Sequence, residues 1–386
     1  MDPREWVRQR AAELTRKEKE ENKTISVKLS PARRIQTEKK RTYHAGDLFL
    51  QPYFHRLGIG EICKEIGERG KYKFNLEDIL AKLVYGRILF PDSKLSTWQH
   101  AKGFIEQPKF ELEDLYRALS VLSRESDFIQ SQLYRNSIAV KLRNTKVIYY
   151  DCSNYYFEIE SDVDFRKYGH SKEHRPNPIV QLGLFMDADG LPLAFCVNPG
   201  NTPETQTMQP LEEKLADNFS LSDFVACTDG GLGSVDNRMY NTTEGRFDDF
   251  YAYGTSLDDH PLEILKVNSF RGEIEALFRV TKTNLNLRPI YLSRKYRIIG
   301  HFITCFISLL LLKQLQHSLP QKHSIDSLCD TLRSIKLLYH DAYGYEPAFD
   351  RTDLTDELQA NANILIDTEI IPKPAMRKIL KQIKER

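Results

Sequence analysis

Three carboxylates lie where they could hold divalent metal ions. Asp151 ends the β-branched and aromatic run VIYYD, Asp229 ends the run FVACTD, and Glu275 lies in FRGEIEALFRVTK, which favours a helix. We expect a strand to end at each aspartate. Open α/β sheets place their ligand sites at such strand ends, which makes both aspartates candidates for ligand binding. Carboxylate oxygens suit Mg²⁺ or Mn²⁺, and two such ions can drive phosphoryl transfer. The three residues therefore predict a two-metal site, although each aspartate alone is more typical of a turn after a strand.

The predicted helix that carries Glu275 has two distinct faces. One is expected to be buried, because its apolar residues recur at helical spacing: Ile274, Leu277, Phe278 and Thr281. Arg271, Glu275 and Lys282 share a second face. A solvated face with one i,i+4 ion pair explains this pattern most simply. Next to a metal site, however, Arg271 and Lys282 would hold phosphates.

Positive charge is concentrated at the two ends of the chain. The 386 residues carry a formal net charge of only +1. Residues 1–41 contain 13 Lys and Arg against 7 Asp and Glu, and residues 373–386 contain 6 against one. Basic ends on a near-neutral body indicate a polyanionic partner, first of all nucleic acid. Two solvated helical ends would have the same composition, so both interpretations stay open.

The remaining composition is typical of a globular cytoplasmic protein. Hydrophobic residues make up 41% of the chain and charged residues 28%, which provides for a large core. The six cysteines contain no CxxC pair, so neither a structural zinc site nor a disulfide framework is indicated. The N-terminus has no apolar run that would predict a signal peptide. The most apolar stretch, residues 298–312, is short for a membrane span, so we expect a core helix and no membrane association.

Hydrophobic periodicity changes near residue 146. Before it, the segments 75–90 and 110–125 have apolar residues at helical spacing. After it, five strands are predicted, two of which form a hairpin around Asp189-Gly190: 147–151, two within 179–198, 223–229 and 249–256. We therefore expect an α/β fold with one mixed sheet.

These elements predict four regions of the chain. They are a basic N-terminal arm (1–45), a helical domain that would bind DNA (46–145), an α/β core (146–318) and a helical C-terminal region with a basic tail (319–386).

Several motifs in a fixed order resemble the DDE transposases of insertion sequences. In one branch of that family the glutamate helix reads Tyr-x2-Arg-x3-Glu-x6-Lys, and Arg271, Glu275 and Lys282 match its spacing. Three longer segments also look like that branch: VIYYDCSNYYFEIE, GHSKEHRPNPIVQLGLFMDADGLPLAFCVNPGNTPE and LNLRPIYLSRKYRIIGHFITCFISLLL. The resemblance runs from about Trp6 to the C-terminus.

The resemblance implies both a fold and an activity. The core would be ribonuclease-H-like, with a mixed five-stranded sheet, and would follow an all-helical domain. Asp151, Asp229 and Glu275 would be the catalytic residues that bind Mg²⁺ or Mn²⁺. The enzyme would hydrolyse phosphodiester bonds at mobile-element ends and join the freed ends to target DNA. Phosphate contacts would come from a set of basic residues: Arg271, Lys282, Lys172, Arg175 and Arg288. The resemblance is also compatible with a homodimer that holds paired ends.

Three departures from the family pattern leave alternatives open. Asn268 stands at the position of the signature tyrosine, and Gly272 stands where relatives have a bulky aromatic residue. Only 46 residues separate Asp229 from Glu275, whereas relatives usually carry a long insertion there. A catalytically inactive DNA-binding remnant is therefore one alternative. A metal-dependent nuclease that performs no strand transfer is another.

We expect DNA binding to be dominated by phosphate contacts. Each neutralised phosphate releases counterions, so log affinity should fall with log salt by about 0.9 per contact on duplex DNA. Fluorescence anisotropy of a labelled duplex, titrated at several salt concentrations, measures this slope. An affinity that does not change with salt would contradict the prediction.

Overall fold

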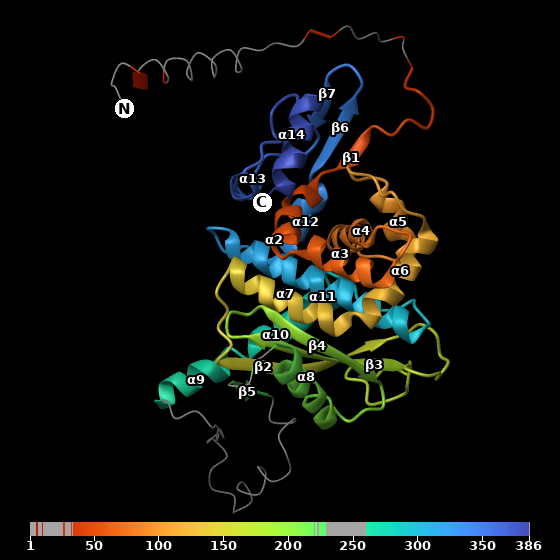
Figure 1. Cartoon of the computed structure of the whole chain (residues 1–386), viewed down its shortest axis with the longest axis vertical. Helices are drawn as coiled ribbons and strands as arrows, with labels where there is room; N and C mark the ends of the chain where they lie inside the picture. The colour runs from red at the N-terminus through yellow and green to blue at the C-terminus, as the bar shows by residue number, and fades with distance from the viewer. Residues whose placement is uncertain are drawn as a thin grey trace, which may run out of the picture.

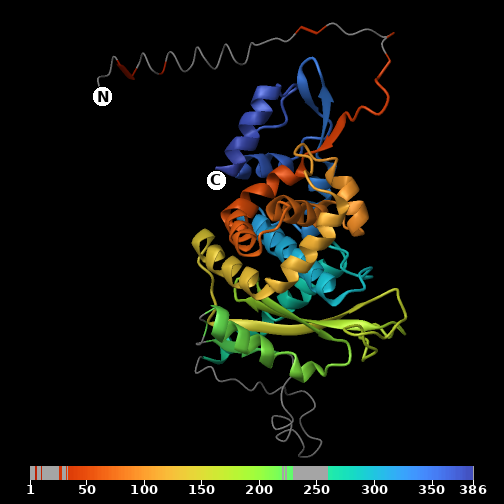
Figure 2. The same ribbon diagram turned by 45° about the vertical axis from the view of Figure 1, so that its right-hand side comes forward.

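The computed structural model describes residues 34–219, 224–228 and 260–385, together with residue 221 and a few isolated residues nearer the N-terminus. Three parts are stacked along the long axis of the molecule: a small sheet with two helices, a block of helices, and a larger sheet (Figures 1 and 2). Asp229 and the predicted strand 249–256 lie outside the described residues.

The larger sheet has four described strands in the order β4-β3-β2-β5. Their bounds are Val147–Tyr156 (β2), Ile179–Asp187 (β3), Pro192–Pro199 (β4) and Val225–Cys227 (β5). β2 is antiparallel to β3 and parallel to β5, while β3 is antiparallel to β4. Gly190 has a φ of +77° in the turn between β3 and β4, a backbone conformation that glycine adopts without strain. The mixed α/β sheet and its hairpin confirm the sequence predictions.

Strand β2 extends further than its sequence suggested. It continues beyond Asp151 to Tyr156, so Asp151 lies inside the strand and not at its end. Pairing with β3 runs without interruption from Asp151 opposite Leu184 to Tyr156 opposite Ile179. The four residues after Asp151 are buried, whereas Asp151 itself is half-buried. The prediction that a strand ends at Asp151 is therefore wrong, because pairing with the distant strand β3 continues past the carboxylate.

Helices cover both faces of the larger sheet. Before the sheet, the described residues form a short 3₁₀ helix, η1 (Gly46–Phe49), and the α-helices α2 (Gln51–Arg56), α3 (Ile59–Gly70), α4 (Leu76–Leu89), α5 (Lys94–Ala101), α6 (Leu112–Arg124) and α7 (Ser126–Val140). Between β4 and the C-terminal region, the described α-helices are α8 (Gln209–Phe219), α9 (Pro261–Ser269), α10 (Gly272–Lys282) and α11 (Lys295–Ser318). In Figures 1 and 2, α10 and α11 lie on one side of the sheet and α8 on the other.

Helix α11 joins the helical region to the sheet. It is buried over most of its length and packs against α4, α6 and β4. Among the described helices, it is the one long and apolar enough to cross a membrane, and 94% of its most apolar window is buried inside the protein. This confirms the predicted core helix. One hydrophobic core contains both Leu119 of α6 and Tyr155 of β2, so packing continues across the predicted boundary at residue 145.

The C-terminal region contains strands as well as helices. Its helices are α12 (Ile325–Ser334), α13 (Asp353–Ala362) and α14 (Lys373–Lys384), and its strands are β6 (Lys336–His340) and β7 (Gly344–Pro347). These strands form a sheet with β1 (Thr42–His44) in the order β1-β6-β7. The prediction of an entirely helical region is therefore wrong. Cross-strand packing of Tyr43, Tyr339 and Tyr345, with ring centroids 5.1–6.2 Å apart, outweighs local helix propensity here.

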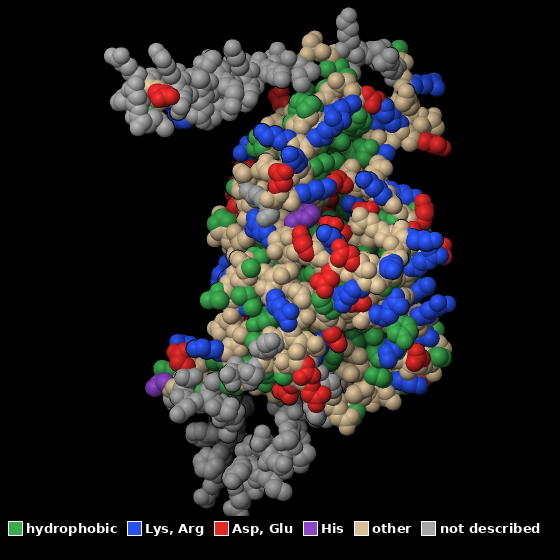
Figure 3. Space-filling view, in the orientation of Figure 1, with side chains coloured by type: hydrophobic (Ala, Val, Ile, Leu, Met, Phe, Trp, Pro, Cys, Tyr) green, Lys and Arg blue, Asp and Glu red, His purple; other side chains and the backbone are tan. Residues whose placement is uncertain are grey.

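The basic tail forms helix α14, which is amphipathic. Met376 and Ile383 are buried on one side of it, while Arg377, Lys378 and Lys381 are exposed. Lys and Arg side chains gather over this helix near the top of Figure 3. The tail is thus a packed helix with a basic outer surface, and its positive charge is presented from a fixed position.

A buried ion pair fastens the β3–β4 hairpin to the segment before β2. Arg143 Nε donates to Asp187 Oδ2 at 2.5 Å, and its Nη2 donates to the Leu191 and Pro192 carbonyls at 3.0 Å. Oδ1 of Asp187 accepts the N–H groups of Asp189 and Leu191 at 3.0 and 2.9 Å. Both side chains are almost completely inaccessible to solvent. Their charges are therefore compensated by each other and by backbone groups.

Replacing Asp187 should destabilise the fold strongly. Asp187→Asn leaves the Arg143 guanidinium buried without its counter-charge, which should lower the free energy of unfolding by about 3–5 kcal/mol. Urea unfolding measures this change. Glu113→Gln, which breaks an exposed pair with Arg117, is the matched control and should cost less than about 1 kcal/mol. Equal losses from the two variants would contradict this account of the hairpin.

Candidate active site

Helix α10 packs on β2, and the chain just before it also contacts this strand. Before α10, the Tyr149 hydroxyl donates to the carbonyl of Val267 in α9 at 2.9 Å, and the Tyr149 ring packs against Phe270, between the two helices. Near the C-terminal end of α10, the Tyr155 hydroxyl is 2.5 Å from Thr281 Oγ1 in a buried hydrogen bond. The predicted apolar stripe of α10 is buried as expected: Ile274, Leu277, Phe278 and Thr281. Because the contacts follow the same order along both elements, α10 runs in the direction of β2.

Asp151 and Glu275 come from two elements that pack against each other. Side chains alternate along a strand, so Asp151 points to the same face of the sheet as Tyr149 and Tyr155, the face that α10 covers. Asp151 is half-buried on this face, and Glu275 is exposed beside the apolar stripe of α10.

Arg271 lies close to the described end of β5. Burial raises the pKa of the Cys227 thiol, and the positive charge of Arg271 opposes part of that rise. Cys227 pairs with Tyr149 in the parallel ladder between β5 and β2. Arg271, the first basic residue of the predicted helix face, thus lies beside β5. In the sequence, Asp229 comes two residues after Cys227, the last residue of that strand.

Lys172 and Lys282 both follow Asp151 in the sequence, from separate segments, and the charge of Asp151 acts on both. Burial lowers the pKa of Lys282, the charge of Lys172 lowers it further, and Asp151 opposes the change. Burial also tends to lower the pKa of Lys172, but nearby acidic groups, including Asp151 and Glu204, outweigh it and raise that pKa. Lys172 Nζ donates to the Cys152 carbonyl at 2.8 Å and lies 3.2 Å from Glu204. The segment 166–175 is therefore fixed next to the strand that bears Asp151.

Close packing also fixes this segment at Gly169. A Cβ atom added there would come within 1.9 Å of the Gly200 carbonyl oxygen, so no larger residue fits without moving the backbone. Asn154 Nδ2 of β2 donates to the His170 carbonyl at 3.1 Å. The basic segment 166–175 is thus held against the larger sheet.

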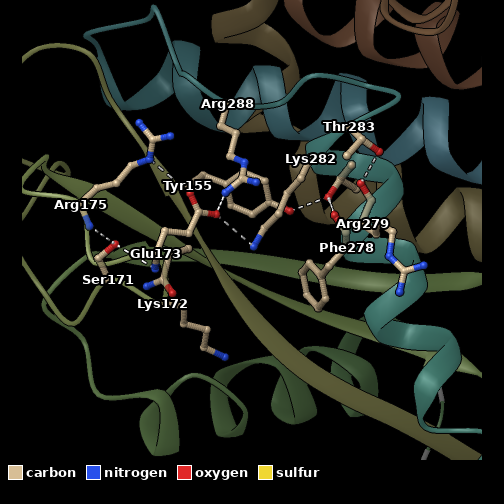
Figure 4. A network of polar contacts seen from close by, with 12 residues as sticks. Tyr155, Ser171, Lys172, Glu173, Arg175, Phe278, Arg279, Lys282, Thr283 and Arg288 are labelled. Carbon is tan, nitrogen blue, oxygen red and sulfur yellow. Dashed lines mark hydrogen bonds and ion pairs between the residues drawn. The ribbon is translucent and has the colours of Figure 1, made fainter.

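Glu173 lies among basic residues that were predicted to contact DNA (Figure 4). Its Oε1 forms ion pairs with Arg288 and, at 3.7 Å, with Lys282 Nζ. Its Oε2 is 3.5 Å from Arg175 Nε. Sequence analysis did not select Glu173. The available signal was a single acidic residue between Lys172 and Arg175 in an otherwise basic segment.

The structure thus brings together most of the predicted site residues that it describes. Arg175, Lys282 and Arg288 contact Glu173, while Lys172 contacts the strand of Asp151 through the Cys152 carbonyl. Arg271 lies near Cys227 of β5, and Glu275 is on the helix that packs on β2. Asp229 lies outside the described residues, so its position relative to the other two carboxylates stays a prediction.

The chemistry of the carboxylates fits a hard divalent cation. Asp151 and Glu275 offer oxygen donors, which Mg²⁺ and Mn²⁺ prefer. One oxygen of Asp151 accepts the Cys152 N–H at 2.7 Å, which helps to orient the carboxylate. Among the described residues, no three His, Cys, Asp or Glu side chains form a metal-binding group. Asp229 is not one of the described residues.

Comparisons with known proteins add no further assignment. A scan against protein-family models and a search of curated proteins both find no match to this chain.

The Tyr155–Thr281 hydrogen bond should contribute measurably to the seating of α10. Thr281→Val leaves the buried Tyr155 hydroxyl without this acceptor, which should lower the free energy of unfolding by about 1–3 kcal/mol. Adding Tyr155→Phe should cost little more, because both polar groups are then absent. Urea unfolding of the two single variants and the double variant measures the coupling.

Thr283→Val is the matched control for this experiment. Thr283 is exposed near the end of the same helix, and its hydroxyl donates only to nearby groups, the Arg279 carbonyl and Asn284. It should change stability by less than about 0.5 kcal/mol. Strictly additive losses from Tyr155→Phe and Thr281→Val would show that this hydrogen bond does not set the position of α10.

Proposed function

We propose that this chain is a DNA transposase of the DDE type. It would bind the ends of a mobile element, hydrolyse phosphodiester bonds there, and join the freed 3′-hydroxyl to target DNA. The observation that carries the proposal is the packing of α10, which bears Glu275, on the face of the sheet to which Asp151 points. A strand and a helix that are far apart in sequence thus carry one carboxylate each, and basic residues stand at both ends of that helix.

The order of the strands supports a ribonuclease-H-like core. The strand of Asp151 pairs on one side with an antiparallel hairpin and on the other with the parallel strand β5. Cys227 is opposite Tyr149, and each precedes an aspartate by two residues in the sequence. This equal spacing supports the proposal that Asp151 and Asp229 belong to one site.

The carboxylates and the basic residues would have separate roles. Asp151, Glu275 and Asp229 would hold Mg²⁺ or Mn²⁺, which when bound polarises the scissile phosphate and activates the attacking oxygen. A guanidinium or ammonium group repels such an ion and attracts phosphate instead. Arg271 near β5 and Lys282 at the far end of α10 would therefore hold the DNA backbone on either side of the carboxylates.

Glu275→Gln should abolish metal-dependent cleavage while DNA binding is retained. The amide keeps the shape of the side chain but removes the charge that would hold a cation. Nicking of supercoiled plasmid in Mg²⁺ or Mn²⁺ measures cleavage, and duplex anisotropy measures binding. Binding should stay within about twofold or become tighter, because one negative charge near phosphate is removed.

Glu273→Gln is the control, because Glu273 lies on the same helix but about 160° around it from Glu275. It is exposed, and the variant should cleave like the unmodified chain. Equal loss of cleavage from the two variants would show that the wrong helix face was chosen. Binding without cleavage by the unmodified chain in either metal would favour a DNA-binding protein without activity. Cleavage without joined product from a labelled donor end would favour a nuclease.

A further inference from the structure

The cluster around Glu173 contains more positive charge than its carboxylate can neutralise. Three basic side chains contact this one acidic group: Arg288, Lys282 and Arg175. Together they leave two positive charges in excess of the single carboxylate. The Glu173 side chain is 26% exposed, so solvent and solutes can reach it from one side. Figure 4 shows Lys282 and Arg288, from a segment far from Glu173 in the sequence, pointing toward its carboxylate, while Nε of Arg175 faces it from the same segment.

Backbone and side-chain contacts fix the surroundings of Glu173 independently of its carboxylate. Ser171 Oγ accepts the N–H groups of Glu173 and Arg175 at 3.3 Å. Lys172 is bonded to the Cys152 carbonyl, and Arg175 stacks over the Tyr156 ring at 4.2 Å. The Glu173 side chain can therefore rotate out of the cluster while the segment that carries it stays in place.

We propose that the Glu173 carboxylate occupies the seat of one DNA backbone phosphate and leaves it when DNA binds. This inference rests on the proposed function. A phosphodiester carries one negative charge, as a carboxylate does, so the exchange keeps the charge of the cluster constant. Its two non-bridging oxygens can accept hydrogen bonds from Arg288 and Lys282 together. Glu173 then keeps the basic residues arranged in the free protein and lowers the affinity for DNA, because it must be displaced.

Removing the charge of Glu173 should therefore strengthen DNA binding. Glu173→Gln should bind a labelled 20-base-pair duplex about tenfold more tightly at low salt, because no carboxylate competes with the phosphate. The slope of log affinity against log salt should stay nearly the same, because a phosphate takes the seat in both proteins and the number of phosphate contacts is equal. Adding Arg288→Ala to Glu173→Gln should reverse most of this gain.

Two further variants control the measurement. Glu273→Gln removes the same charge from an exposed position outside the cluster and should change affinity by less than about twofold. Glu173→Asp keeps the charge but withdraws the carboxylate by one methylene, so it should give an intermediate gain in affinity. Urea unfolding of each variant establishes that it is folded, and if Glu173→Gln does not fold, Glu173→Asp tests the same expectation.

The outcomes separate this inference from the function on which it rests. If neither the unmodified chain nor Glu173→Gln binds duplex DNA, the proposed function fails and the inference fails with it. If the unmodified chain binds with a steep salt dependence but Glu173→Gln binds equally or more weakly, the inference alone is overturned. Glu173 would then be a permanent clamp that holds Lys282 and Arg288 for DNA.

Discussion

The packing of α10 against β2 is the contact on which the proposed chemistry depends. A buried apolar stripe provides the free energy, and two tyrosine hydroxyls of β2, one bonded to α9 and one to α10, help to set the register. If α10 slid by one helical turn, about 5.4 Å, Glu275 would move by that distance relative to Asp151. The same slide would take Lys282 away from Glu173. The core packing beneath α10 therefore also sets the positions of the site residues, so substitutions in that core should affect both stability and site geometry.

The sequence predicted the parts of this arrangement that follow from local periodicity. The stripe of α10, the hairpin at Gly190 and the core helix α11 all depend on patterns within about 20 residues, and all were found. The end of β2 and the strands β6 and β7 were mispredicted, because they depend on pairing with distant partners. β6, for example, is completed by Thr42–His44 at the other end of the chain.

The candidate site shows the same difference between what local patterns predict and what depends on distant contacts. The identity of Asp151, Glu275 and the basic residues came from spacing and family resemblance, which need no coordinates. Their positions relative to one another came from the register of α10 on β2, which no local pattern encodes. Glu173 was missed because an acidic residue in a basic segment has no meaning until Lys282 and Arg288 are placed beside it.

The three-stranded sheet has a consequence for how the molecule would meet a long polyanion. Through β1 and β6 it ties Thr42, near the end of the basic arm, to the region that ends in the basic helix α14. The two most positive segments of the sequence are thus tethered to one end of the molecule, and the larger sheet lies at the other (Figures 1 and 2). Once one of the two tethered segments is bound, the other engages at a high effective concentration. A duplex that also reached the larger sheet would lie lengthwise along the protein. The distance between the two sheets would then set the length of DNA between the part bound by the basic segments and the scissile bond.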